Sequence, residues 1–258
     1  MTTPPDPDRP FRIRFPAGQK LPEWQLRQFQ FSGCLILFLL LFVSCLLPLF
    51  LIETAQQALL NLNLSPTGAI LVILGIVIGS TINIPISRRL SGRTVEVPLE
   101  STITNWPPMS RTARLNEELI IAVNVGGCVI PSLLGLWVLR PLLEQGGTVL
   151  SVLLIGIVLN SLICYYCSRP IEGLGILLPL WVPALVALAV PWIGLGADSY
   201  APFRPAVAYL IGISGPLLGA DLLRWKDFHK IGSGVVSIGG AGTWDGILLS
   251  GLVAAFLV

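Results

Sequence analysis

The chain has 258 residues, of which 53% are hydrophobic and only 12% are charged, and its mean hydropathy is +0.80. These values exclude an ordinary soluble domain and indicate an integral membrane protein. The net charge of +2 is too small to indicate a nucleic-acid partner. We therefore expect the protein to interact with the lipid bilayer and not with nucleic acid.

Residues 1–30 are rich in Pro and Arg, which predicts a disordered cytoplasmic tail before a single transmembrane domain over 31–258. Seven apolar segments follow, most of them near the roughly 20 residues that a helix needs to cross a membrane. They cover about 32–52, 68–87, 118–139, 147–166, 174–196, 204–221 and 234–258. The predicted fold class is therefore all-α, a bundle of about seven transmembrane helices. A cytoplasmic loop at about 88–117 is long enough for a short hairpin or a lid.

Basic residues predict the orientation of the chain. With a cytoplasmic N-terminus, fourteen of the 16 Lys and Arg residues fall on cytoplasmic segments, and only Arg140 and Arg204 fall outside. Short cytoplasmic loops of membrane proteins are enriched in Lys and Arg. We therefore expect the N-terminus in the cytoplasm and the C-terminus outside.

Three apolar segments contain residues that interrupt helices, and there we expect broken helices: Asn83–Pro85, Asn124–Pro131 and 231–243, the last with an extended or re-entrant start. Irregular backbone inside a membrane is tolerated where protein covers it or where it lines a wet cavity. At 1.5 Å per helical residue, the breaks and two nearby aspartates lie in one layer roughly 5–10 Å inside the cytoplasmic face. We expect a polar chamber there, lined by Asn83, Asn124, Gly239, Gly240, Gly242 and Thr243. Asn83 and Asn124 have the alternative role of hydrogen bonding between helices.

The two aspartates, Asp221 and Asp245, lie in apolar sequence on consecutive segments. A carboxylate at membrane depth is costly, so it is a functional-site candidate by default. Two carboxylates a few ångströms apart share a proton, and such a pair supplies a general base and a general acid. We therefore assign both as candidate catalytic residues. Their alternatives are structural: Asp245 as a helix N-cap, and Asp221 as an ion-pair partner of Arg224 or Lys226.

Five blocks of the sequence resemble a known family. They are Gly79-Ser-Thr-Ile-Asn-Ile-Pro85, Asn124-Val-Gly-Gly-Cys-Val-Ile-Pro131, Ser168-Arg-Pro-Ile-Glu-Gly-Leu-Gly-Ile176, Gly219-Ala-Asp-Leu-Leu223 and Ser237-Ile-Gly-Gly-Ala-Gly-Thr-Trp-Asp-Gly-Ile247. They are similar to the signature blocks of a prokaryotic family of multi-pass membrane proteins catalogued only as a domain of unknown function. The resemblance covers about 68–258 and implies a prokaryotic-type plasma (inner) membrane, but it implies no activity.

The aspartates also resemble, more loosely, those of intramembrane aspartyl proteases of the presenilin and prepilin-peptidase type. Those proteins carry one aspartate on one span and a second in a Gly-x-Gly-Asp motif on another. Here Gly240-Ala-Gly-Thr-Trp-Asp245 has two extra residues before the aspartate.

The sequence leaves three functions open. The first is a hydrolase with an aspartate dyad, acting on a membrane-embedded or extended peptide that pairs with the glycine-rich backbone at 237–242. The second is an ion-coupled secondary transporter with discontinuous helices, and the third is a membrane scaffold without catalysis. The sequence shows no phosphate-binding loop, metal-ligand cluster or Ser/His arrangement, so we expect no cofactor and no metal. It does not indicate an oligomeric state.

Overall fold

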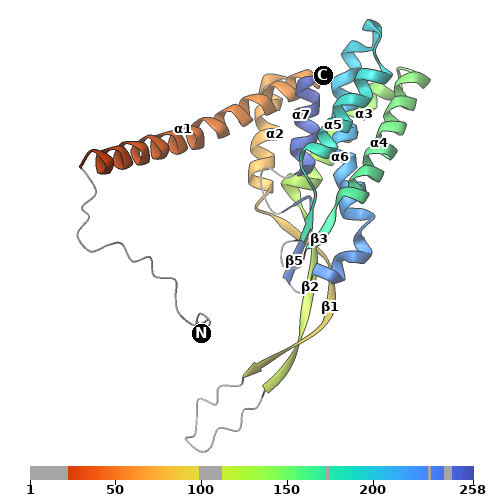
Figure 1. Cartoon of the computed structure of the whole chain (residues 1–258). Helices are drawn as coiled ribbons and strands as arrows, with labels where there is room; N and C mark the ends of the chain where they lie inside the picture. The colour runs from red at the N-terminus through yellow and green to blue at the C-terminus, as the bar shows by residue number, and fades with distance from the viewer. Residues whose placement is uncertain (1–22, 99–111, 172–174, 232–233, 241–245) are drawn as a thin grey trace, which may run out of the picture. The chain divides into compact units, whose positions relative to one another are not determined.

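The computed structural model describes residues 23–98, 112–171, 175–231, 234–240 and 246–258. The chain divides into two compact units, residues 1–50 and 51–258. Of the predicted tail, residues 1–22 lie outside the described residues, and a helix begins at Glu23. In order, the helices and strands are α1 (Glu23–Asn61), α2 (Pro66–Gly79), β1 (Asn83–Pro98), β2 (Thr112–Asn124), α3 (Ile130–Leu143), α4 (Gly147–Cys167), β3 (Arg169–Ile171), β4 (Gly175–Leu177), α5 (Trp181–Gly194), α6 (Arg204–Ser214), β5 (Gly234–Ile238) and α7 (Gly246–Leu257) (Figure 1). Two π-helical segments, η1 (Val125–Val129) and η3 (Gly215–Leu222), and two 3₁₀ segments, η2 (Asp198–Phe203) and η4 (Trp225–Ile231), complete the order.

The described chain is mainly helical, as predicted. Within it, four helical runs are long and apolar enough to cross a membrane: Leu40–Asn61, Val125–Leu143, Gly147–Cys167 and Asp198–Leu222. Three further apolar helices, α2, α5 and α7, are shorter, at 14, 14 and 12 residues. Four long runs confirm the membrane character of the chain, and they leave the predicted count of about seven spans open.

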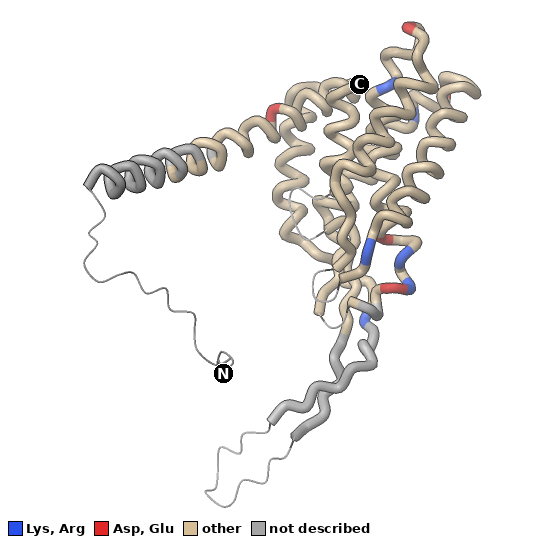
Figure 2. The backbone as a smooth tube through the Cα atoms, in the orientation of Figure 1, with Lys and Arg blue, Asp and Glu red and all other residues tan. Residues whose placement is uncertain are grey.

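The outer surface of the helices in residues 51–258 is apolar. Ile193 is 84% exposed, Leu136 65% and Ile155 64%, each on a different helix. Figure 2 shows that most charged residues of this unit lie towards the ends of the helices. Exposed apolar side chains over such long stretches fit a lipid environment rather than water.

The structure differs from the predicted all-α bundle because it contains a three-stranded sheet with the order β1-β2-β5. Strands β1 and β2 are antiparallel and form a hairpin in the region of the predicted loop, while β2 and β5 are parallel, with Leu119 opposite Gly234 and Val123 opposite Ile238. A second, two-stranded sheet is formed by β3 and β4.

The strand β2 replaces the start of a helix predicted from about residue 118. The apolar run Leu119-Ile-Ile-Ala-Val123 has enough hydrophobicity for either structure. Three of its five residues are β-branched and favour a strand. Leu119 and Ile121 are buried in a small core beneath the sheet, together with Phe228, Ile231, Val236 and Ile238.

Two of the three predicted helix breaks, at Asn83–Pro85 and at Asn124–Pro131, are junctions between helix and strand. Helix α2 ends at Gly79 and β1 begins at Asn83, where the residue before Pro85 is restricted to extended backbone. Asn124 ends β2 and is the N-cap of the helical run from 125 to 143, since its side chain accepts a hydrogen bond from Gly127 N. In the third region, β5 supplies the extended backbone that was expected within 231–243.

The main core lies among the helices and includes the fully buried side chains of Leu59, Tyr209, Ile211 and Leu248. Helices α6 and α7 approach closely at Gly212, where an added Cβ would lie 2.6 Å from the Cα of Gly251. Small residues permit such close contact between membrane helices. This packing joins α6 and α7, the α-helices that come before and after β5 in the sequence.

Candidate functional site

A polar network joins the three strands where they meet the helical layer. Asn83 begins β1, Asn124 ends β2 and Ser237 lies in β5. Asn124 Nδ2 donates to Asn83 Oδ1 at 3.1 Å, and Ser237 Oγ donates to the same oxygen at 2.7 Å. The two asparagines therefore lie together, as the predicted chamber requires, and the sequence analysis had not assigned Ser237 to it.

Asn124 is the buried centre of this network, with no exposed surface. Besides its bond to Asn83, it donates to the backbone oxygen of Ser80 at 2.8 Å and accepts from Gly127 N at 2.7 Å. One amide side chain therefore holds the end of α2, the start of β1 and the start of the next helix. Its role in the structure is positional, and Asn124 is not among the residues that line the cavity at Asp221 described below.

The turn after β5 passes directly over the start of η1. Gly239 has φ +87°, a conformation that favours glycine. A Cβ on Gly127 would collide with the backbone oxygen of Gly239, and a Cβ on Gly239 would lie 2.7 Å from Cys128 N. Two glycines are therefore required for the two backbones to cross here. Gly239, which was predicted to line the chamber, is not among the residues that line the cavity at Asp221 described below.

Asp221 is joined to this turn. It lies in η3 and is partly buried, and its Oδ2 accepts a hydrogen bond from Gly239 N at 3.0 Å. The π-helical winding of η3 adds a residue per turn, and such segments occur frequently at functional sites. The structure thus brings Asp221 to the end of β5, two residues beyond the Asn83–Ser237 contact.

Asp221 also lines a cavity of about 230 Å³. Its other lining residues come from β4 and the segment after it, from η3, from β5 with its following turn, and from the start of α7: Gly175, Ile176, Leu178, Leu180, Pro216, Ala220, Val235, Val236, Ser237, Gly240, Gly246 and Ile247. The cavity far exceeds the roughly 10–15 Å³ that one water molecule needs. It is polar on the side of Asp221, Ser237 and the exposed glycine backbone.

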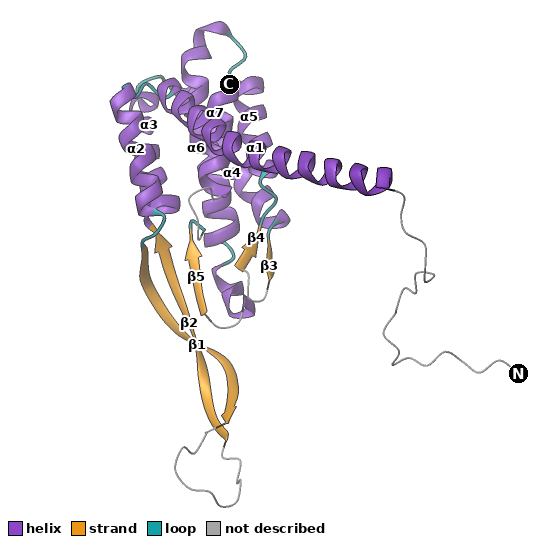
Figure 3. Ribbon diagram, turned by 90° about the vertical axis from the view of Figure 1, so that its left-hand side faces the viewer, coloured by secondary structure: helices purple, strands orange, loops and turns teal. Residues whose placement is uncertain are grey.

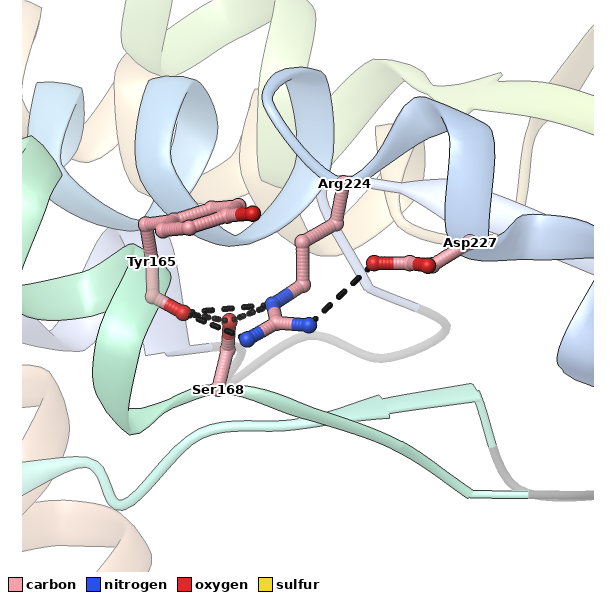
Figure 4. Close-up of polar contacts among 4 residues, drawn as sticks. All are labelled: Tyr165, Ser168, Arg224 and Asp227. Atoms are coloured by element: carbon pink, nitrogen blue, oxygen red, sulfur yellow. Dashed lines mark hydrogen bonds and ion pairs between the residues drawn. The ribbon is translucent and has the colours of Figure 1, made fainter.

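Arg224, considered above as an ion-pair partner of Asp221, is directed elsewhere (Figure 4). Its guanidinium group donates to Tyr165 O, to Ser168 Oγ at 2.6 Å and to Asp227 Oδ2 at 3.2 Å. It also lies 4.7 Å from the centre of the Tyr165 ring. These contacts bind the end of η3 to the end of α4, which anchors the segment that carries Asp221.

The remaining predicted residues have different outcomes. Gly240 lines the cavity. Gly242, Thr243 and Asp245 lie outside the described residues, so the proposed pairing of the two aspartates stays a prediction. Gly246, the residue after Asp245 in the chain, lines the same cavity as Asp221.

Helices of membrane-spanning length and an apolar outer surface define this chain as a multi-pass membrane protein, and it contains a cavity beside a small sheet. Comparison with family models identifies its family. Residues 77–257 match the model described as "Protein of unknown function (DUF1614)", and because this match covers more than half of the chain, the protein belongs to that family. Searches of curated proteins and of solved structures gave no match. The resemblance to intramembrane aspartyl proteases therefore has no support from these comparisons.

Proposed function

We propose that the cavity at Asp221 is the active site of a hydrolase that uses Asp221 and Asp245 as paired carboxylates. One observation carries the proposal: Asp221 lines a cavity of about 230 Å³, and Gly246, which directly follows Asp245, lines the same cavity. A carboxylate in membrane-type sequence that faces a cavity is a functional-site candidate rather than a packing residue.

In the proposed reaction, water hydrolyses an amide bond held in the cavity. Asp221 accepts a backbone N–H bond from Gly239, an interaction that stabilises an ionised carboxylate, so we assign Asp221 as the general base. It takes a proton from water while the water oxygen attacks the carbonyl carbon. Asp245, in its protonated form, donates to the carbonyl oxygen. Breakage of the C–N bond, with a proton passed to nitrogen, releases a carboxylic acid and an amine.

The test is cleavage of a mixture of synthetic membrane peptides by the full chain in liposomes, with products identified by mass spectrometry. Asp221→Asn, Asp245→Asn and the double variant should lose cleavage to the same extent, because members of one catalytic unit are not additive. Asp198→Asn is the matched control, since Asp198 is exposed in η2 and does not line the cavity. Cleavage that survives either of the first two substitutions would refute the dyad.

Ion-coupled transport is a second candidate and rests on a different observation. Two helical runs of spanning length, 125–143 and 198–222, contain π-helical segments, η1 next to Asn124 and η3 with Asp221. Interrupted helices with polar groups at the interruption are typical of transporter ion sites. Proton- or sodium-dependent uptake into liposomes that is lost in Asp221→Asn, without any peptide cleavage, would favour this function.

For the topology, we propose that α2, α5 and α7 cross the membrane together with the four longer runs, which makes seven crossings. The distribution of Lys and Arg then places the N-terminus in the cytoplasm and the C-terminus outside. Reporter fusions after Val258 and within 99–111 should report opposite sides of the membrane. Reports from one side only would contradict this topology.

A further inference from the structure

The cavity at Asp221 lies between the edges of the two sheets. Within the described chain, β5 is paired only with β2 and β4 only with β3. The cavity is lined by Gly175 and Ile176 of β4 on one side and by Val235–Ser237 of β5 on the other. Figure 3 shows β4 next to β5, on the side of β5 away from β1 and β2.

The facing edges of β4 and β5 form a site where an extended polypeptide can pair through its backbone. An unpaired edge presents a row of backbone N–H and C=O groups that can pair with another extended chain. Pairing of this type gives affinity through the main chain, and side-chain pockets add selectivity. A segment inserted between β5 and β4 would join the two sheets and would pass beside Asp221.

A second cavity lies in the helical layer, next to Leu180. It measures about 430 Å³ and is lined almost entirely by apolar side chains of α5 and α7: Trp181, Ala184, Leu185, Leu188, Leu249, Val253 and Leu257, together with Leu180 and Ser250. Leu180 lines both cavities, so they adjoin. The Ser250 hydroxyl donates to Gly212 O at 2.8 Å, which leaves the occupant of this groove with apolar contacts.

From these two adjoining spaces we infer that the binding partner is a membrane-anchored polypeptide. Its apolar helix lies in the groove between α5 and α7, and its chain continues as an extended strand between β5 and β4. A lipid acyl chain fits the apolar groove but has no amide groups to pair with the strand edges, whereas a polypeptide satisfies both spaces. This inference rests on the proposed function only for the cleavage step, because binding is a separate event.

The probe is a synthetic peptide with an apolar helix of about 20 residues, followed by an extended Val/Thr segment of about six residues that carries a benzophenone group. The full chain with Asp221→Asn is placed in phosphatidylcholine nanodiscs, so that the peptide stays intact. After illumination, labelled positions are mapped by mass spectrometry. We expect labelling at 175–178 and 234–237, and little at 83–87, the outer strand β1 of the same sheet.

Two modified peptides test the two halves of the site. A peptide with N-methylated residues in the extended segment keeps its side chains but loses its amide donors, and labelling should fall about ten-fold or more. A peptide without the apolar helix should lose labelling to a similar extent. In the protein, Val253→Trp fills the groove and should reduce labelling, while Val158→Trp on the exposed face of α4 should not.

Labelling that is unchanged by N-methylation, or that is concentrated at 83–87, would overturn the inference. Excess lipid could also abolish labelling while changes to the extended segment have no effect. That result would assign the groove to lipid acyl chains and would also overturn the inference. A different result would refute the proposed function alone. If the peptide labels 234–237 but the unsubstituted chain never cleaves it, the binding site stands and the hydrolase function is refuted.

Discussion

Replacement of Asn124 by alanine tests whether one buried amide holds the site together. The side chain has no exposed surface and makes three hydrogen bonds, to Ser80 O, to Asn83 Oδ1 and from Gly127 N. Alanine leaves the backbone groups of Ser80 and Gly127 without this partner, and an unsatisfied buried group costs about 1–3 kcal/mol. For two such groups we expect Asn124→Ala to lower the free energy of unfolding by about 2–6 kcal/mol.

The loss can be measured by heating the protein in detergent with a thiol-reactive dye, because Cys164 is fully buried and reacts after unfolding. At about 2–4 °C per kcal/mol for a domain of this size, Tm should fall by roughly 4–24 °C. Asn83→Ala is the comparison, since Asn83 is exposed and its loss should cost about 0.5–1.5 kcal/mol. An Asn124→Ala variant as stable as the parent, or no less stable than Asn83→Ala, would refute this account of the network.

The same assay tests two other contacts. Gly127→Ala should destabilise the protein by about 1–3 kcal/mol, because the new methyl group meets the backbone oxygen of Gly239; Gly147→Ala, where an added Cβ meets nothing within 4 Å, should have little effect. A tolerated Gly127→Ala would show that the turn after β5 can move away. Arg224→Lys should cost about 1–2 kcal/mol because lysine cannot reproduce the branched set of hydrogen bonds, whereas Arg169→Lys at an exposed position should be neutral. Equal stability of the two lysine variants would contradict an anchoring role for Arg224.

Local signals in the sequence predicted the places where helices stop. Asn83 with Pro85 follows the end of α2, and Asn124 with two glycines begins the helical run from 125. Both positions follow from local backbone preferences and were readable without the fold. The strand β2 was not readable, because a short apolar run such as Leu119–Val123 suits a helix and a buried strand equally.

The contacts of the site depend on pairing between distant segments. Ser237 meets Asn83 across 154 positions of sequence, and Asp221 meets Gly239 across 18. Depth counting along separate helices predicted one layer for Asn83, Asn124 and Asp221. It could not show which backbone group Asp221 accepts, because that depends on the turn after β5 and on the missing Cβ of Gly127.

The parallel pairing of β2 with β5 also constrains the order in which the protein is assembled. The hairpin of β1 and β2 is complete once residue 124 is made, but the partner of Leu119 is Gly234, roughly 115 residues later. At a synthesis rate of about 5–20 residues per second, one edge of β2 waits roughly 6–20 s for its neighbour. During this interval α3 to α6 are synthesised while an apolar strand edge stays open to incorrect pairing. A nascent chain halted before residue 234 should therefore be unusually sensitive to aggregation and to chaperone capture.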